Sequence, residues 1–250
     1  MSAEGFAAGP PQGETRPLGG QRSTRSGERG GNIVFFDLDH TLLSGDSDVL
    51  WCDFLIAQGL LDAAEFGAQN ADMDARYRAG TVGLDEFANF YVGTLASRSP
   101  QDWESLRQQF LHEEIVPRIP PSALALVQQH QAAGDLVVMT TATNRFITEL
   151  TAEHIGIANL IATEPVVANG VFTGRTSGTL NMREGKVARL HAWLQDRAQA
   201  LDQFHSSAYS DSINDLPLLS AVQRPVAVDP DARLRQEAMQ RGWQILELVR

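Results

Sequence analysis

The segment from residue 33 to residue 43 reads IVFFDLDHTLL, an apolar β-strand that nevertheless contains two aspartates, Asp37 and Asp39. A buried carboxylate is costly unless it is paired, hydrogen-bonded or bound to a metal. Two carboxylates separated by a single leucine therefore predict that this strand ends in a polar site. The fold must bury the strand and still give both side chains partners.

The rest of the chain alternates apolar strands with helical patterns. Further strands are expected at residues 136–141, 160–163, 206–210, 225–228 and 243–248. The first of these, LVVMTT, begins as an unbroken apolar run and so predicts a strand buried on both faces. An Asn-Gly pair at 169–170 predicts the turn of a β-hairpin. This alternation is typical of an α/β fold with a mainly parallel sheet.

Helical patterns fill residues 47–119, between the first two main strands. A block of about 70 residues is too long for an ordinary crossover, which predicts an inserted helical cap. Residues 1–31 are rich in Gly, Pro, Ser and Arg and lack the apolar stretch of a secretory signal, so we expect a disordered tail. The expected domains are the tail at 1–31, a core formed by 32–46 and 120–250, and the cap at 47–119.

The composition limits the partners. The formal net charge of −11 argues against nucleic acid or an anionic membrane surface as the main partner. Cys52, the single cysteine, cannot form an internal disulfide, and its apolar neighbours favour a buried core residue in a reducing compartment. No apolar run approaches the ~20 residues that span a bilayer. We therefore expect a soluble, cytoplasmic protein.

Polar residues follow several of the expected strands. In open α/β sheets, ligands bind beyond the carboxyl ends of the strands. The residues at such ends, together with a lysine at the start of an expected helix, are Asp37, Asp39, Thr141, Lys186, Asp211 and Asp215. They are far apart in the sequence but would converge on one crevice. Taken singly, DLD is also compatible with a solvated turn and the lysine with a surface charge, whereas the combination in this order favours a site.

These residue types suit phosphoryl transfer. Asp37 can attack phosphorus and form an aspartyl-phosphate, which splits the displacement into two steps. Asp39 can protonate the leaving oxygen and later activate water. Oxygen ligands from Asp37, Asp39 and Asp211 suit Mg²⁺, which offsets the charge of the phosphoryl group. The Thr141 hydroxyl and the Lys186 ammonium can hold phosphoryl oxygens.

Four segments resemble the motifs of the haloacid dehalogenase superfamily of phosphatases: DLDHT, VVMTT, GKVARL and SDSINDLPLL. A helical insertion between the first two resembles subfamily IB, the branch of phosphoserine phosphatase-like and histidinol-phosphatase-like enzymes. The resemblance covers residues 32–250. It implies a Rossmann-like parallel sheet with an inserted all-helical C1-type cap, Mg²⁺ dependence and hydrolysis of a phosphomonoester.

By position, the resemblance implies Asp37 as the nucleophile and Asp39 as the acid and base. It assigns phosphate binding to Thr141, Lys186 and Asn214, and metal binding to Asp37, Asp39, Asp211 and Asp215. The chain departs from phosphoserine phosphatases in two places. TTATN replaces their usual Ser-Gly-Gly run, and Ser210 replaces a glycine before the fourth motif. These departures favour another small amino-bearing phosphomonoester, such as histidinol phosphate, over phosphoserine.

Three residues close to or within the expected cap are candidates for substrate recognition. Asp46 occupies roughly the place of a substrate-sensing acid, and Arg76 is a candidate substrate contact. Trp51 would face the site from the first cap helix. Each also has a plainer interpretation, which is solvated surface charge for Asp46 and Arg76 and packing between cap and core for Trp51.

Two other functions stay open at this point. A phosphotransferase or mutase would pass the aspartyl-phosphate to another hydroxyl, which requires that the cap exclude water. A receiver-like domain would use phosphorylation of Asp37 as a switch, but such domains are much shorter and lack a helical insertion. Asp39 favours the enzyme, because an acid and base two residues from the nucleophile hastens hydrolysis. The sequence leaves the oligomeric state open.

Overall fold

The computed structural model describes residues 30–249, so the tail expected at 1–31 lies outside the described residues except for Gly30 and Gly31. Those two glycines open the first strand, which therefore begins two residues before the expected core boundary. Between residues 30 and 249, none of the helices has both the length and the apolar character that crossing a bilayer requires.

A seven-stranded sheet forms the core of the described chain, in the spatial order β4-β3-β2-β1-β5-β6-β7. The strands are β1 (Gly30–Asp37), β2 (Leu136–Asn144), β3 (Asn159–Ala168), β4 (Val171–Ser177), β5 (Phe204–Ser210), β6 (Arg224–Val228) and β7 (Gln244–Leu246). All neighbours pair in parallel except β3 and β4, which form an antiparallel hairpin. Asn169 and Gly170, between them, have φ values of 51° and 82°, as a type I′ turn requires. The predicted α/β fold with a mainly parallel sheet is confirmed.

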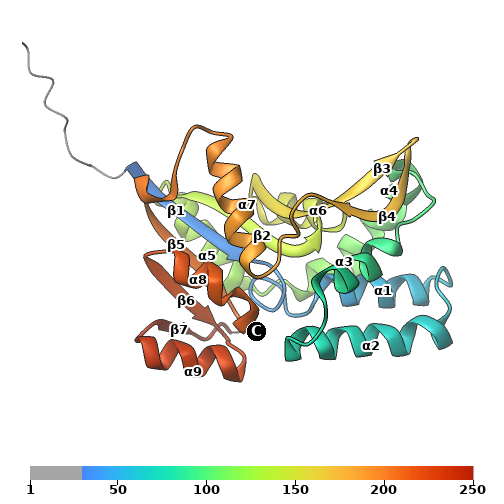
Figure 1. Cartoon of the computed structure of the whole chain (residues 1–250), viewed down its shortest axis with the longest axis horizontal. Coiled ribbons are helices and arrows are strands. Elements are labelled where there is room, and N and C mark those ends of the chain that lie inside the picture. The colour runs from blue at the N-terminus through green and yellow to red at the C-terminus, as the bar shows by residue number, and fades with distance from the viewer. Residues whose placement is uncertain (1–29, 250) are drawn as a thin grey trace, which may run out of the picture.

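Helices cover both faces of this sheet (Figure 1). One face carries α5 (Pro121–Ala132) and α6 (Arg145–Ile155). The other face carries α7 (Glu184–Gln195), α8 (Leu216–Ala221) and α9 (Ala232–Arg241). Val34 and Phe36 of β1 pack on the first face, and Ile33 and Phe35 pack on the second. Burial on both faces explains why β1 is a continuous apolar run rather than an alternating one.

A helical segment connects β1 to β2. Its elements are α1 (Ser47–Ala57), α2 (Ala63–Ala79), α3 (Leu84–Gly93), α4 (Pro100–Phe110), the π-helix η1 (Leu111–Ile115) and the 3₁₀-helix η2 (Val116–Arg118). Figure 1 shows α1, α2 and α3 grouped beyond the carboxyl end of β1. Trp51 and Phe54 of α1 share one buried cluster with the sheet, whereas Met73, Phe87 and Tyr91 belong to a smaller second cluster. The segment is therefore only partly independent of the core, and the domain boundaries stay a prediction.

The chain turns sharply after β1. The carbonyl oxygen of Leu38 accepts hydrogen bonds from the backbone N–H groups of Thr41, Leu42 and Leu43, at 3.2, 2.9 and 2.9 Å. His40 lies within this turn and adopts a left-handed conformation with φ of 56°. The turn keeps Thr41 beside the end of the strand, where its side chain can reach the carboxylates of the site.

A second local constraint places Lys186. Gly185 precedes it in the first turn of α7, where the backbone of Leu180 passes directly against the glycine α-carbon. A Cβ at position 185 would overlap the carbonyl oxygen of Leu180. Position 185 therefore accepts only glycine unless the backbone moves. Such a movement would also displace the neighbouring Lys186.

Gly185→Ala is expected to lower the free energy of unfolding by about 1–3 kcal/mol, because the added methyl group forces packed backbone apart. Gly67→Ala is the matched control, since Gly67 lies within α2 and a Cβ there meets nothing within 4 Å. In that helix, alanine should stabilise by about 0.5–1 kcal/mol. Urea unfolding of both variants measures the difference. A Gly185→Ala variant as stable as the wild type would contradict this account of the start of α7.

Candidate active site

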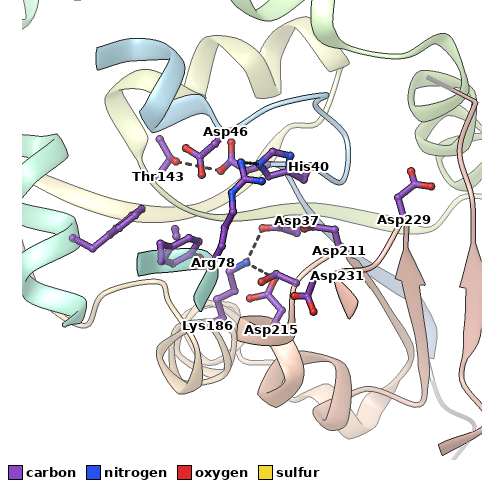
Figure 2. A pocket seen from close by; sticks show the side chains of 15 residues that line it. Asp37, His40, Asp46, Arg78, Thr143, Lys186, Asp211, Asp215, Asp229 and Asp231 are labelled. Atoms are coloured by element: carbon purple, nitrogen blue, oxygen red, sulfur yellow. Dashed lines mark hydrogen bonds and ion pairs between the residues drawn. The ribbon is translucent and has the colours of Figure 1, made fainter. Parts of the chain in front are cut away.

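A cavity of about 260 Å³ lies beyond the carboxyl ends of β1, β2, β5 and β6. Seven aspartates line it: Asp37, Asp39, Asp46, Asp211, Asp215, Asp229 and Asp231. Figure 2 shows how most of these side chains surround the cavity, together with the two permanently cationic side chains of its wall, Lys186 and Arg78. The structure therefore brings all four predicted catalytic and metal-binding residues, Asp37, Asp39, Asp211 and Asp215, together at the edge of the sheet where they were expected.

Lys186 is the centre of the site. Its Nζ donates to Asp37 Oδ1 at 2.7 Å and to Asp215 Oδ2 at 2.6 Å. The lysine side chain is 2% exposed, and the hydroxyl of Ser210 donates a further bond to Asp215 Oδ2 at 2.8 Å. A lysine from α7 thus joins the ends of β1 and β5. Asp215, expected as a metal ligand, contacts this lysine through Oδ2 and also lines the cavity, and its metal role stays a prediction.

Burial dominates the electrostatics around this lysine. It raises the pKa of Asp37 to about 8, against the attraction of Lys186, while Asp215 and Asp39 add to the rise. Burial alone would lower the pKa of Lys186, but Asp215 and Asp37 raise it above its ordinary value. The 2.7 Å contact supports an ion pair between the Lys186 ammonium and the Asp37 carboxylate, because a buried ammonium favours an ionised partner. A further cation near Asp37 would remove its tendency to take up a proton.

Asp37 and Asp211 flank one hydroxyl group. Thr41 Oγ1 lies 3.4 Å from Asp37 Oδ2 and 3.2 Å from Asp211 Oδ1. Burial, and then the charge of Asp37, raises the pKa of Asp211 well above its ordinary value. Among residues 30–249, no group of three or more His, Cys, Asp or Glu side chains has an arrangement that could hold a metal ion by itself. Two carboxylates still fit Mg²⁺, which takes oxygen ligands and keeps several waters.

Both oxygens of Asp39 have hydrogen-bond donors. Oδ1 accepts from the backbone N–H of Ser47 at 2.7 Å, and Oδ2 accepts from the hydroxyls of Thr141 and Thr143 at 3.0 and 3.2 Å. Thr141, expected to bind phosphate, is fully buried and directs its hydroxyl to this carboxylate. Thr143 lies in the cavity wall (Figure 2), because β2 continues past the expected strand end to Asn144.

Asp46 has two roles in the structure. Its Oδ1 caps α1 by accepting from the backbone N–H groups of Asp48 and Val49, both at 3.0 Å. The same side chain lines the cavity, and burial, followed by the charge of Asp39, raises its pKa to about 8. The buried carboxylate of Asp46 therefore agrees with the candidate role in recognition.

The other two recognition candidates lie elsewhere. Arg76 forms an ion pair with Glu86 at 2.7 Å and is not part of the cavity wall. Trp51 is fully buried among Phe54, Trp103 and Phe110, also outside the wall. The structure thus gives both residues the plainer role of packing or surface charge.

Arg78 takes the place that the sequence interpretation gave to Arg76. It lies in the wall of the cavity, 2.7 Å from Asp74 and 3.2 Å from His40 Nε2 (Figure 2). Because arginine only donates, His40 Nε2 accepts this bond. Side chains two residues apart in a helix, such as those of Arg76 and Arg78, point to nearly opposite sides of it. The arginine that faces the site depends on how α2 packs, which the sequence pattern did not reveal.

Several residues of the wall were missed. Asp229 and Asp231 follow β6, and the rule that sites lie beyond strand ends points to them as well. Asp231 Oδ1 caps α9, and its Oδ2 accepts from the backbone N–H of Ile213 at 2.7 Å.

Asn214, expected to bind phosphate, donates to the carbonyl oxygen of Tyr77 and does not line the cavity. Its phosphate role stays a prediction.

Known proteins match this chain over most of its length. The model of haloacid dehalogenase-like hydrolases matches residues 34–220. A histidinol-phosphatase from Neisseria meningitidis is 42% identical over 217 residues, covering 86% of this chain and 98% of that protein. A protein of unknown function from Bordetella pertussis has a solved structure with TM-score 0.82 and 44% identity, covering 86% of this chain and 97% of that one. A substrate-bound phosphoserine phosphatase, at 15% identity, TM-score 0.64 and coverage of 88% and 94%, is alike in fold alone.

The matched residues include all four segments that resemble family motifs, from DLDHT to SDSINDLPLL. They also cover the helical segment between β1 and β2 and the sheet as far as β5 and α8, but not β6 and β7. The expectation drawn from the motifs is confirmed: the chain belongs to the haloacid dehalogenase-like hydrolase family, among its phosphatases.

Proposed function

We propose that this enzyme hydrolyses a small phosphomonoester in two steps, through an aspartyl-phosphate on Asp37. The observation that carries the proposal is the pairing of Asp37 with Lys186 in the wall of a cavity, with Asp39 two residues further on. The pair orients one carboxylate toward bound substrate and keeps a positive charge beside it.

Each side chain then has a task. Asp37 attacks phosphorus, the ester bond to the leaving oxygen breaks, and Asp39 supplies the proton to that oxygen. Asp39 next takes a proton from water as the water attacks the acyl-phosphate, which frees phosphate and restores Asp37. Thr141, Thr143 and the Ser47 N–H fix the Asp39 carboxylate throughout. Lys186 stabilises charge on the phosphoryl oxygens.

The residues that would hold Mg²⁺ are Asp37, Asp211 and the backbone carbonyl of Asp39. The ion would offset the negative charge of the phosphoryl group and of the attacking carboxylate. Asp215 would support it indirectly, because the contacts of its Oδ2 with Lys186 and Ser210 already fix its orientation.

We propose a small amino-bearing metabolite as the substrate, of the histidinol phosphate type. The cavity is small, about 260 Å³, and its wall carries seven aspartates. Asp46 supplies a buried carboxylate that suits an ammonium group. Arg78 is already paired with Asp74, so a substrate carboxylate would have to compete for it. The similarity to the Neisseria histidinol-phosphatase supports the same choice. The cytoplasmic location stays a prediction from the composition.

A transferase or mutase is the second candidate; it would require that Tyr77 and Arg78 of α2, which line the cavity, keep water from the aspartyl-phosphate. The receiver-like switch is disfavoured by the helical segment and by the carboxylate of Asp39 in the cavity wall.

Phosphate release from a panel of phosphomonoesters tests the function. The panel contains histidinol phosphate, phosphoserine, sugar phosphates and nucleotides, each with Mg²⁺ and with EDTA. We expect Mg²⁺-dependent release that is fastest from histidinol phosphate. Asp37→Asn should lower kcat by at least about a thousandfold, because it removes the nucleophile, while its circular dichroism stays that of the wild type. Appreciable Mg²⁺-dependent turnover by Asp37→Asn would show that Asp37 is not the nucleophile.

Asp46→Asn is expected to raise KM for the amino-bearing substrate by about 10- to 100-fold, the value of a charge-assisted hydrogen bond. Asparagine remains a good helix cap, so α1 should stay folded. KM for p-nitrophenyl phosphate, which has no amine, should change little. Asp62→Asn is the matched control, because Asp62 caps α2 in the same way at an exposed position outside the cavity. An equal effect of Asp46→Asn on both substrates would refute the proposed recognition of an amine.

A further inference from the structure

The carboxyl end of α2 rests on three side chains of the core. The contacts are Asn214 Nδ2 to Tyr77 O at 3.1 Å, Arg233 Nη2 to Arg78 O at 2.6 Å, Arg233 Nη1 to Ala79 O at 3.1 Å, and Arg183 Nη2 to Gly80 O at 3.2 Å. Four consecutive carbonyl groups thus accept hydrogen bonds from core side chains. These donors come from η4 (Ile213–Asp215), from the first turn of α9, and from the residue before α7.

Such carbonyls need partners. The last carbonyl groups of an α-helix have no donor within the helix and carry partial negative charge. Guanidinium and amide groups are good partners for them. In most helices, water or the following residues of the same chain fill this role. Here the donors come from the other side of the cavity, so the same bonds that complete α2 also tie it to the core.

The position of Arg233 is otherwise unfavourable. A cation in the first turn of a helix opposes the helix dipole, and Arg233 is the second residue of α9. Its side chain is exposed, so burial does not explain it. The carboxyl end of α2 supplies the opposite partial charge. The two hydrogen bonds from the Arg233 guanidinium to the carboxyl end of α2 therefore explain why an arginine occupies this position.

Arg183 shows a second sign of constraint. It adopts φ of 49° and ψ of −124°, a sparsely populated conformation for a residue with a side chain. Backbone strain of this kind persists only where surrounding contacts hold it. It lies three residues before Lys186, and its guanidinium donates to the carbonyl oxygen of Gly80 at the end of α2.

We propose that Arg183, Asn214 and Arg233 form a latch, the α2 latch, that holds the helical segment closed on the core. Arg233 is its main positioning residue, because it binds the backbone of Arg78 itself. Tyr77 and Arg78 are part of the cavity wall, so the latch sets the distance between this wall and Asp37. The role in turnover rests on the proposed phosphatase function, whereas the role in closure does not.

The test compares Arg233→Gln with Arg233→Lys and with Arg235→Gln. Arg235 is the matched control, since it lies on the same helix and pairs with Glu247 rather than with α2. Hydrogen–deuterium exchange is followed at the amides of Gly80 and Thr81, which are bonded to Tyr77 and Arg76. Steady-state kinetics with p-nitrophenyl phosphate and Mg²⁺ give KM and kcat for each variant.

We expect Arg233→Gln to speed exchange at these amides by about tenfold or more and to raise KM by about fivefold or more, with a smaller change in kcat. Arg233→Lys should restore part of both effects, and Arg235→Gln should match the wild type. Unchanged exchange in Arg233→Gln would overturn the latch. Faster exchange with unchanged KM would overturn the positioning role. If the wild type hydrolyses no phosphomonoester, the proposed function fails, and exchange alone decides the latch.

Discussion

The contact on which the rest of the site depends is that of the almost fully buried Lys186 ammonium with Asp37 and Asp215. A buried charge is stable only when it is paired and hydrogen-bonded, so these three groups fix one another. The sheet must bring β1 and β5 side by side, and α7 must begin close to both. The tight turn at Gly185 is the local consequence, because it lets α7 start against Leu180. The ends of β1 and β5 are thus held in register with the lysine.

The helical segment between β1 and β2 supplies the rest of the cavity wall. The sheet and α7 provide a lysine and a group of carboxylates, which would suit many phosphate esters. Asp46 adds a buried carboxylate that also caps α1, so the start of that helix and the wall of the cavity depend on one side chain. The end of α2 adds Tyr77 and Arg78, and its backbone is bound by core side chains. If Asp46 recognises the substrate and the latch holds α2, as proposed, these two helix ends couple closure to recognition.

The sequence could predict the residues whose place follows from the sheet. Asp37, Lys186 and Asp211 lie at the ends of strands or helices, and parallel strands bring such ends to one edge. It could not predict how helices pack on that edge. Whether Arg76 or Arg78 faces the cavity depends on the rotation of α2, and Trp51 turns to aromatic neighbours more than 50 positions away. Thr143 was missed because β2 keeps its extended conformation beyond its apolar residues.

The central claim is that the carboxylate of Asp37 becomes phosphorylated in each turnover. The most direct measurement mixes the enzyme with substrate and Mg²⁺, quenches it in acid within milliseconds, and locates the phosphoryl group by peptide mass spectrometry. Asp39→Asn serves as the slow variant, because loss of the general base should prolong the intermediate. We expect a phosphoryl group on Asp37, at higher occupancy in Asp39→Asn than in the wild type. Release of phosphate with no label on Asp37 in either protein, or a label on another residue, would contradict it.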